Sequence, residues 1–351
     1  MFDRGELLRK LALNALRYSG VATLARGWTG GLGAILMLHR VTAAPAKPLG
    51  FNRHLAITPD FLDALLTAMR RAGYAFVTMD EAVERLARPG RGLFATISAD
   101  DGYRDNFLEA LPVLERHEAP IAIHVAPGLI NGDVDLWWDL VEDIVAARDR
   151  LYLTTPEGRV AIDCSTLLRK QEANQRLHDY LTNDVRENEQ AAALRELARS
   201  VGIDHRAPSR DTLMGWDELR AISRHPLVTI GAHTVHHYNL RRLSDEQAQR
   251  EIAGAARILA LELGKTPRHM AYPYGYASAV GPREVRLARE AGFVSAVTTR
   301  HGLLQPQHAR HLHALPRISV NGRYQRVSHV QTMLTGVTTP LANGGRRVVT
   351  V

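Results

Sequence analysis

The chain has 351 residues, 45% of them hydrophobic and 23% charged, which fits a globular protein with either one large α/β barrel or two ordinary domains. Its single cysteine, Cys164, excludes an internal disulfide and is compatible with a reducing compartment. The net charge of +7 comes mostly from arginines spread along the chain, without the basic stripe interleaved with aromatic residues that marks a nucleic-acid surface, so we expect no nucleic-acid partner.

Residues 1–33 are predicted to form an amphipathic helix over 6–18, followed by a linker. Apolar side chains share one stripe of this helix: Leu7, Leu8, Leu11, Ala12 and Ala15. Basic residues accompany the stripe: Arg4, Arg9, Lys10 and Arg17. The stripe predicts that the helix docks on the main domain, and the alternative is a helix that lies on a membrane surface.

The N-terminus lacks the features of a membrane span or a secretory signal. No segment of the chain reaches the ~20 apolar residues that cross a bilayer. Asp3 and Glu6 stand where a signal peptide is positive, and Arg9 and Lys10 interrupt its apolar stretch. We therefore expect a cytoplasmic protein, and peripheral membrane contact through residues 1–18 stays open.

From residue 34 onward, short apolar runs alternate with helical patterns. Strands are expected at 34–38, 75–79, 93–98, 120–125, 227–232, 268–272, 293–298 and 315–320. Helices are expected near 60–72, 80–87, 106–117, 216–224, 245–263 and 283–291. The alternation predicts an α/β fold with a parallel sheet, open or closed into a barrel.

Two segments do not follow this alternation of strands and helices. Residues 131–215 are mostly polar and helical, and we interpret them as a helical insertion within a main domain over 34–325. Residues 326–351 are expected to form a C-terminal tail, which is loose over 335–351 because Thr-Thr-Pro and Asn-Gly-Gly occur there.

Two adjacent carboxylates, Asp100 and Asp101, follow the apolar run that begins at Phe94, and Gly102 comes next. At the carboxyl end of a strand in an α/β fold, such side chains face the mouth where ligands bind. Two neighbouring carboxylates repel each other, and a cation is the natural way to keep both ionised. Taken alone, however, an Asp-Gly pair is also a common turn.

A second strand-like run ends at His233-Thr-Val-His-His237. If a helical turn begins there, His233 and His237 project from one face and can share one metal ion. His236 would lie on another face. A third run ends at Tyr272-Pro-Tyr-Gly275, a rigid turn that can point a backbone N–H at a bound oxygen or simply join a strand to a helix.

In order and type, these three segments resemble the motifs of the polysaccharide deacetylase family, also called the NodB-homology domain or carbohydrate esterase family 4. The aspartate pair is similar to its Thr-Phe-Asp-Asp-Gly motif, His233-Thr-Val-His-His237 matches His-[Ser/Thr]-x-x-His, and Tyr272-Pro-Tyr-Gly275 resembles its Arg-x-Pro-[Tyr/Phe]-Gly turn. Ile35–Val41 and Leu315–Val320 look like the first and closing strands of its bacterial branches.

This resemblance implies a distorted (β/α) barrel and the removal of N-acetyl groups from amino sugars in a polymer or oligomer. It further implies that Asp101, His233 and His237 bind a divalent metal, typically Zn²⁺, and that Asp100 is the general base. The expected partner is an N-acetylated glycan, and the sequence leaves its identity and the oligomeric state open.

The chain departs from the family pattern in the third motif, where Ala271 replaces the arginine. The Asp-x-x-x-Trp motif that holds that arginine is not visible near 295–310 either. We therefore expect Asp100 to lack its usual cationic neighbour. Arg317 on the closing strand either contacts substrate or forms an ion pair.

The mechanism requires an oxyanion donor and an acid for the leaving nitrogen. The backbone N–H of Tyr274 is the expected donor to the oxyanion. His39 at the end of the first strand and His313 in a loose Leu-His motif are two candidate acids. Trp137-Trp138 opens the insertion, where it either stacks on a sugar ring or anchors a helix.

Two other functions fit the same residues. The missing arginine makes an O-acetyl esterase or a non-sugar amidase credible on the same metal site. A carbohydrate-binding protein with a decayed site is the non-catalytic alternative, although retention of both aspartates and both ligand histidines argues against it.

Overall fold

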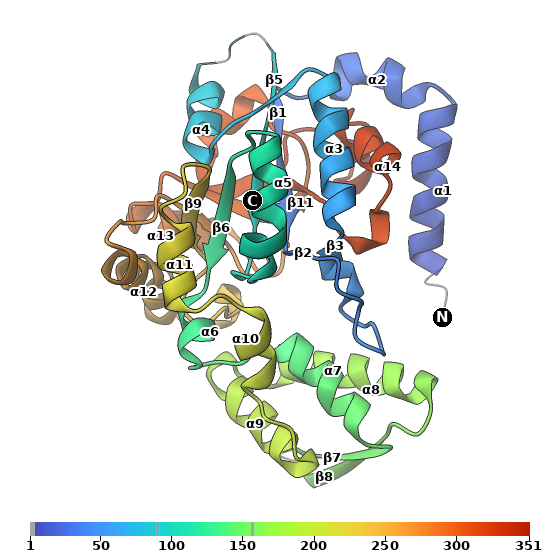
Figure 1. The fold of residues 1–351 in the computed structure, drawn as a ribbon, viewed down its shortest axis with the longest axis vertical. Coiled ribbons are helices and arrows are strands. Elements are labelled where there is room, and N and C mark those ends of the chain that lie inside the picture. The colour runs from blue at the N-terminus through green and yellow to red at the C-terminus, as the bar shows by residue number, and fades with distance from the viewer. Residues whose placement is uncertain (1–3, 89, 91, 156–157) are drawn as a thin grey trace.

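Seven parallel strands form a closed barrel in the computed structural model, which describes residues 4–88, 90, 92–155 and 158–351 (Figure 1). In ring order the strands are β1 (Gly33–Leu38), β12 (Leu315–Ser319), β11 (Ser295–His301), β10 (His269–Ala271), β9 (Val228–Ala232), β6 (Ile121–Val125) and β5 (Leu93–Ala99). The ring closes where β1 pairs with β5 over six residues, from Gly33 opposite Phe94 to Leu38 opposite Ala99. The predicted (β/α) barrel is thus confirmed.

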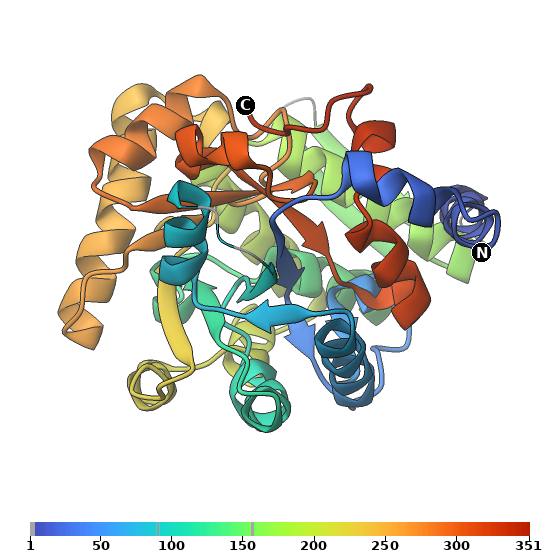
Figure 2. The ribbon, with the colours of Figure 1, turned by 90° about the horizontal axis from the view of Figure 1, so that it is seen from above.

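Helices surround the strands, as Figure 2 shows. They are α3 (Pro59–Arg71), α4 (Met79–Ala87), α5 (Leu111–Arg116), α11 (Trp216–Ile222), α12 (Asp245–Leu263) and α13 (Pro282–Glu290). Three of them follow a residue whose side chain caps the first turn. The hydroxyls of Thr58 and Thr78 accept from the backbone N–H of Phe61 and Glu81, at 3.2 and 3.1 Å, and Ser244 forms a capping box with Gln247.

One expected strand is shorter than predicted. A strand is expected over 75–79, but β4 (Tyr74–Phe76) ends early because the Thr78 side chain caps α4. β4 pairs with only the first residues of β5, so it lies outside the closed ring.

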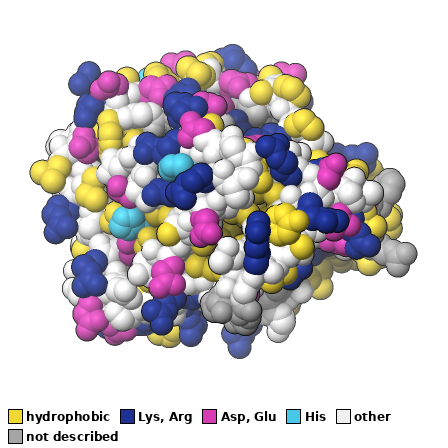
Figure 3. Space-filling model, turned by 90° about the horizontal axis from the view of Figure 1, so that it is seen from below, with side chains coloured by type: hydrophobic (Ala, Val, Ile, Leu, Met, Phe, Trp, Pro, Cys, Tyr) yellow, Lys and Arg dark blue, Asp and Glu magenta, His cyan; other side chains and the backbone are white. Residues whose placement is uncertain are grey.

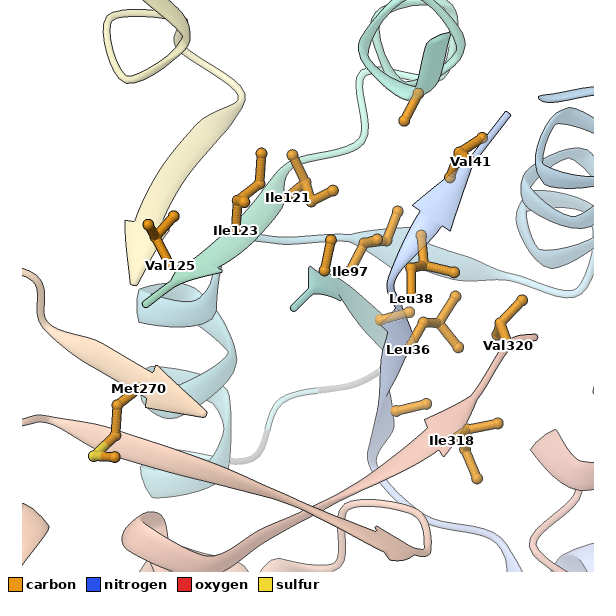
Figure 4. Close-up of a cluster of buried hydrophobic side chains, with 14 of the residues drawn as sticks. Leu36, Leu38, Val41, Ile97, Ile121, Ile123, Val125, Met270, Ile318 and Val320 are labelled. Carbon is orange, nitrogen blue, oxygen red and sulfur yellow. The ribbon is translucent and has the colours of Figure 1, made fainter. Parts of the chain in front are cut away.

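Alternate residues of the barrel strands face different apolar clusters. Leu36 and Leu38 pack outward with side chains of α3 and α5, and Figure 4 shows them near Ile97 and Ile318 of neighbouring strands. Ile35, the residue before Leu36, packs with side chains of the other strands. Strands buried on both faces have continuous apolar runs, which is why these strands were recognisable in the sequence.

The segment 131–215 contains helices, as expected, and lies beyond one end of the barrel in Figure 1. The helices are α7 (Trp137–Ala147), α8 (Leu167–Asp179), α9 (Gln190–Val201) and α10 (Ala207–Thr212). It also contains an antiparallel hairpin, β7 (Arg150–Thr155) with β8 (Gly158–Asp163), that the sequence analysis missed. Leu151 and Leu153 are buried between exposed neighbours, a period-two pattern that could have revealed the first strand.

The C-terminal segment 326–351 forms α14 (Val327–Leu334) and α15 (Thr338–Ala342). The stretch 335–351, expected to be loose, contains α15, and its Val349 is buried with its carbonyl oxygen 3.0 Å from Nε2 of His308. Val330, Met333 and Leu334 are spaced for one face of a helix and join the main core. The domain boundaries themselves stay predictions.

The N-terminal segment forms two helices, α1 (Arg4–Tyr18) and α2 (Val21–Thr29), and α1 packs beside α14. The apolar stripe that is expected to face the main domain faces solvent instead, since Leu8 and Leu11 are exposed. The buried leucine of this helix is Leu13, which lies outside the stripe. Among the described residues, no helix is both long and apolar enough to cross a membrane.

Candidate metal centre and active site

The predicted site residues lie at the carboxyl ends of barrel strands. Asp100 and Asp101 follow β5, and His233 and His237 follow β9. Parallel strands of a closed barrel end on one rim, which is why segments far apart in the chain meet there.

Three of these side chains form a cluster that could hold a metal ion. One ligand atom from each of Asp101, His233 and His237 lies within 4.8 Å of the others. The Oδ1 atom of Asp101 is 3.5 Å from Nε2 of His233 and 3.4 Å from Nε2 of His237. The three ligand atoms, one from each side chain, therefore converge on one point.

Two further observations show that the cluster fits a divalent cation. Nδ1 of His233 donates to the carbonyl oxygen of Ala271 at 2.7 Å, which fixes the tautomer and leaves Nε2 as the free ligand nitrogen. Oδ1 of Asp101 is buried and has no hydrogen-bond partner among the described residues. A bound cation would satisfy this oxygen, and a donor set of two imidazoles and one carboxylate suits zinc with an open position.

The pKa values follow from burial and from the neighbouring charges. Burial and the charge of Asp100 raise the pKa of Asp101 well above its ordinary value. Burial lowers the pKa of His233 to about 4, and burial with the charge of His233 lowers the pKa of His237 well below its ordinary value. The two imidazoles are thus neutral, which metal ligation requires.

The backbone at the site adopts left-handed conformations that residues other than glycine rarely occupy. Of the five such residues in the described chain, four lie here: Asp101 (φ 72°), Thr234 (φ 58°), His237 (φ 56°) and Tyr274 (φ 63°). Residues 233–237 therefore do not form the helical turn that would place both histidines on one helix face. The two histidines converge from a loop, in which the Thr234 hydroxyl accepts from the backbone N–H of His237 at 3.1 Å.

Asp100 has the cationic neighbour that the sequence analysis expected it to lack. The Arg317 guanidinium donates to both carboxylate oxygens, at 2.8 and 2.7 Å, and both side chains are buried. Burial alone would raise the pKa of Asp100, but Arg317 and a hydrogen bond from His124 more than offset it, and the pKa lies well below its ordinary value.

His124 is a residue that sequence reasoning missed, and for Arg317 the structure shows the ion-pair alternative, with Asp100 as the partner. Nδ1 of His124, on β6, is 3.1 Å from Oδ1 of Asp100. Each is a lone polar residue within an apolar strand. Because a buried charge or imidazole needs a partner, that pattern could have indicated a polar site inside the barrel.

Aromatic rings flank the cluster of Asp101, His233 and His237. The ring centroids of Trp138 and Tyr274 lie 5.1 and 5.3 Å from that of His237. The indole N–H of Trp138 donates to the Tyr103 hydroxyl at 2.9 Å, which fixes the ring. Trp137 is buried in the core of the insertion, where it anchors α7. Trp138 instead borders the site, beside His237.

The structure places Tyr274 and His39 at the site and His313 elsewhere. Among the described residues, the backbone N–H of Tyr274 has no hydrogen-bond partner, as an oxyanion donor requires. His39 follows β1 at the rim. Nε2 of His313 is 2.7 Å from the carbonyl oxygen of Phe293, before β11, and His313 itself precedes β12. It therefore lies at the opposite end of the barrel, where it cannot reach the leaving group.

Comparison with known proteins agrees with this architecture. The family model described as polysaccharide deacetylase matches residues 170–295, which include 233–237 and 272–275 but not 100–102. No curated protein sequence matches the chain.

Solved structures share the fold at low sequence identity. The Streptococcus pyogenes deacetylase PplD, in complex with acetate, has a TM-score of 0.56 and 18% identity, over 87% of this chain and 99% of its own. IcaB from Ammonifex degensii has a TM-score of 0.53 and 18% identity, over 87% and 98%. The Bacillus cereus polysaccharide deacetylase BC0361 has a TM-score of 0.52 and 14% identity, over 86% and 68%. The family match over residues 170–295 and the shared barrel agree with the resemblance to the NodB-type polysaccharide deacetylases that the motifs indicate.

Proposed function

We propose that the protein is a metal-dependent hydrolase that removes N-acetyl groups from an N-acetylated amino-sugar polymer or oligomer and releases acetate. The observation that carries the proposal is the convergence of Asp101, His233 and His237 on one point with Asp100 beside them. The family match supports deacetylation of a polysaccharide, and the rest of the proposal depends on these side chains.

Asp101, His233 and His237 would hold the metal, most readily Zn²⁺. When bound, such an ion polarises the acetyl carbonyl and makes its water more acidic. Asp100, kept ionised by Arg317, would accept the proton of the attacking water. The N–H of Tyr274 would donate to the developing oxyanion, and the ring faces of Trp138 and Tyr274 would contact the sugar.

His39 is our proposed donor to the leaving nitrogen. Burial lowers its pKa to about 4, so His39 is neutral at pH 7 and must gain a proton during the reaction. Asp100, whose charge raises the pKa of His39, is the group from which the proton would come.

We expect His39→Ala to lower the rate of acetate release by about 10²-fold or more, the usual contribution of a general acid. His313→Ala, the matched control, should keep the rate within about twofold because its ring hydrogen-bonds at the other end of the barrel. Steady-state kinetics on an N-acetylglucosamine oligomer would measure both. A larger loss in the His313 variant than in the His39 variant, at equal Tm, would reverse the assignment.

Acetate release tests the function directly. We expect acetate from N-acetylglucosamine oligomers or a partly acetylated polymer, loss of that activity after treatment with a chelator, and recovery when Zn²⁺ is added back. Elemental analysis of the purified protein should find about one metal ion per chain. Turnover that ignores the chelator would contradict the metal-dependent mechanism.

The assay should include an O-acetylated sugar and a cyclic amide. The absence of the family arginine at Ala271 made these substrates credible. Arg317, however, supplies a cation to Asp100 from another strand, so the absence at Ala271 no longer favours them. Preference for the ester or the cyclic amide would replace the proposed substrate while leaving the metal site in place. The cytoplasmic location remains a prediction.

A further inference from the structure

The outward face of α1 is apolar, although a solvent-facing helix surface is normally polar. Leu8 and Tyr18 are 66% and 81% exposed, and Leu11 between them is exposed too. These positions lie three and seven residues apart, on one side of the helix. Leu13, 7% exposed, belongs to the docked side.

The docked side of α1 is already occupied by this chain. Asn14 lies within hydrogen-bond distance of His329 on α14, with Oδ1 3.1 Å from Nε2, and Arg17 donates to Gln331. The exposed stripe is therefore additional to the surface that holds the helix in place.

The second helix continues the apolar surface. Val21, Leu24 and Trp28 are exposed and spaced three and four residues apart, and Leu24 is 84% exposed. Ala22 and Thr29 face the protein, where the Thr29 hydroxyl donates to the carbonyl oxygen of Thr335 at 2.9 Å. Half of the exposed large hydrophobic side chains among the described residues lie in these two helices: Leu7, Leu8, Leu11, Tyr18, Val21, Leu24 and Trp28.

The charges beside this surface are almost all positive. Arg9, Arg17 and Arg26 are exposed, and the Arg347 guanidinium lies 4.6 Å from the centroid of the Trp28 ring. Glu6 is the only acidic residue between 4 and 30, and it forms an ion pair with Lys10. In the view of Figure 3, hydrophobic and basic side chains lie side by side toward the right edge, with acidic side chains among them.

We propose that the outward faces of α1 and α2 form a docking surface for an anionic lipid bilayer. Apolar side chains would enter the boundary between head groups and acyl chains, and the arginines would contact the lipid phosphates. Tyrosine and tryptophan, apolar rings with one polar atom, favour that boundary. A second copy of the chain fits less well, because it would bring two basic surfaces together.

Vesicle flotation tests this surface without reference to the deacetylase reaction. The full chain is mixed with vesicles of phosphatidylcholine alone or of phosphatidylcholine with phosphatidylglycerol. We expect at least about tenfold more protein bound to the anionic vesicles, and less binding as salt is raised. Equal recovery with both compositions, or no binding, would overturn the proposal.

One triple variant and one double variant locate the contact. L8S/L11S/L24S should lower binding to anionic vesicles about tenfold or more. L167S/L168S, which changes two exposed leucines of α8, is the matched control and should bind like the parent chain. Both should release acetate from a soluble oligomer at the parent rate, since none of these leucines lies at the metal cluster. Equal vesicle binding by the two variants, or a triple variant that only changes the oligomeric state in sedimentation, would reject lipid as the occupant.

Discussion

Asp100→Asn is expected to lower the rate of acetate release by about 10³-fold or more while the protein keeps its metal. Asparagine cannot accept a proton, whereas the proposed ligands Asp101, His233 and His237 are unchanged. Asp101→Asn should instead lose the metal and the activity together, because it removes one of the three proposed protein ligands. The measurements are metal content by elemental analysis and single-turnover acetate release.

One consequence of Asp100→Asn needs its own control. The substitution leaves the Arg317 charge buried without its partner, which costs about 3–5 kcal/mol of folding free energy. The double variant D100N/R317M removes both charges, and it should recover Tm while staying inactive. A folded, metal-loaded Asp100→Asn protein with the parent rate would show that Asp100 is not the base.

Arg317→Met is expected to lower the rate near neutral pH by about 10²-fold. Arg317 is what holds the pKa of Asp100 below its ordinary value against the effect of burial. Without it that pKa rises, so Asp100 is protonated at pH values where it was ionised, and activity should return as pH increases. Arg317→Lys, which keeps the charge but not the two parallel hydrogen bonds, should recover part of the rate.

The pH dependence of kcat/KM distinguishes this role from a structural one. The acidic limb of the profile should move to higher pH in Arg317→Met and much less in Arg317→Lys. Loss of stability alone would lower the amount of active protein without moving the limb, and Tm measured in parallel would reveal it. An unmoved limb in Arg317→Met would mean that Arg317 does not set the ionisation of Asp100.

Much of the barrel was predictable because its signals are local. Apolar runs bounded by turns give the strands, and cap residues such as Thr58 and Ser244 mark helix starts. The motifs at 100–102 and 233–237 could be assigned to one rim because parallel strands share a direction. The order of the strands around the ring, and its closure between β1 and β5, depends on pairings across long stretches of chain.

The features that could not be predicted depend on tertiary partners. Ala271 in place of the family arginine suggested an isolated Asp100, but the cation comes from β12, more than two hundred residues away. Likewise, the apolar stripe on α1 predicts the helix correctly, but it predicts the wrong side of the helix to face the protein. Periodicity identifies an apolar face, but it does not say whether protein or another apolar phase covers that face.

The left-handed backbone at Asp101, His237 and Tyr274 has a consequence for metal uptake. Each conformation is unfavourable for its residue, so the surrounding barrel must impose it when the chain folds. Two of the three proposed ligands, Asp101 and His237, would then be preorganised before an ion binds, and little entropy would remain to be lost on coordination. The apo and metal-loaded proteins should accordingly share one loop geometry at this rim.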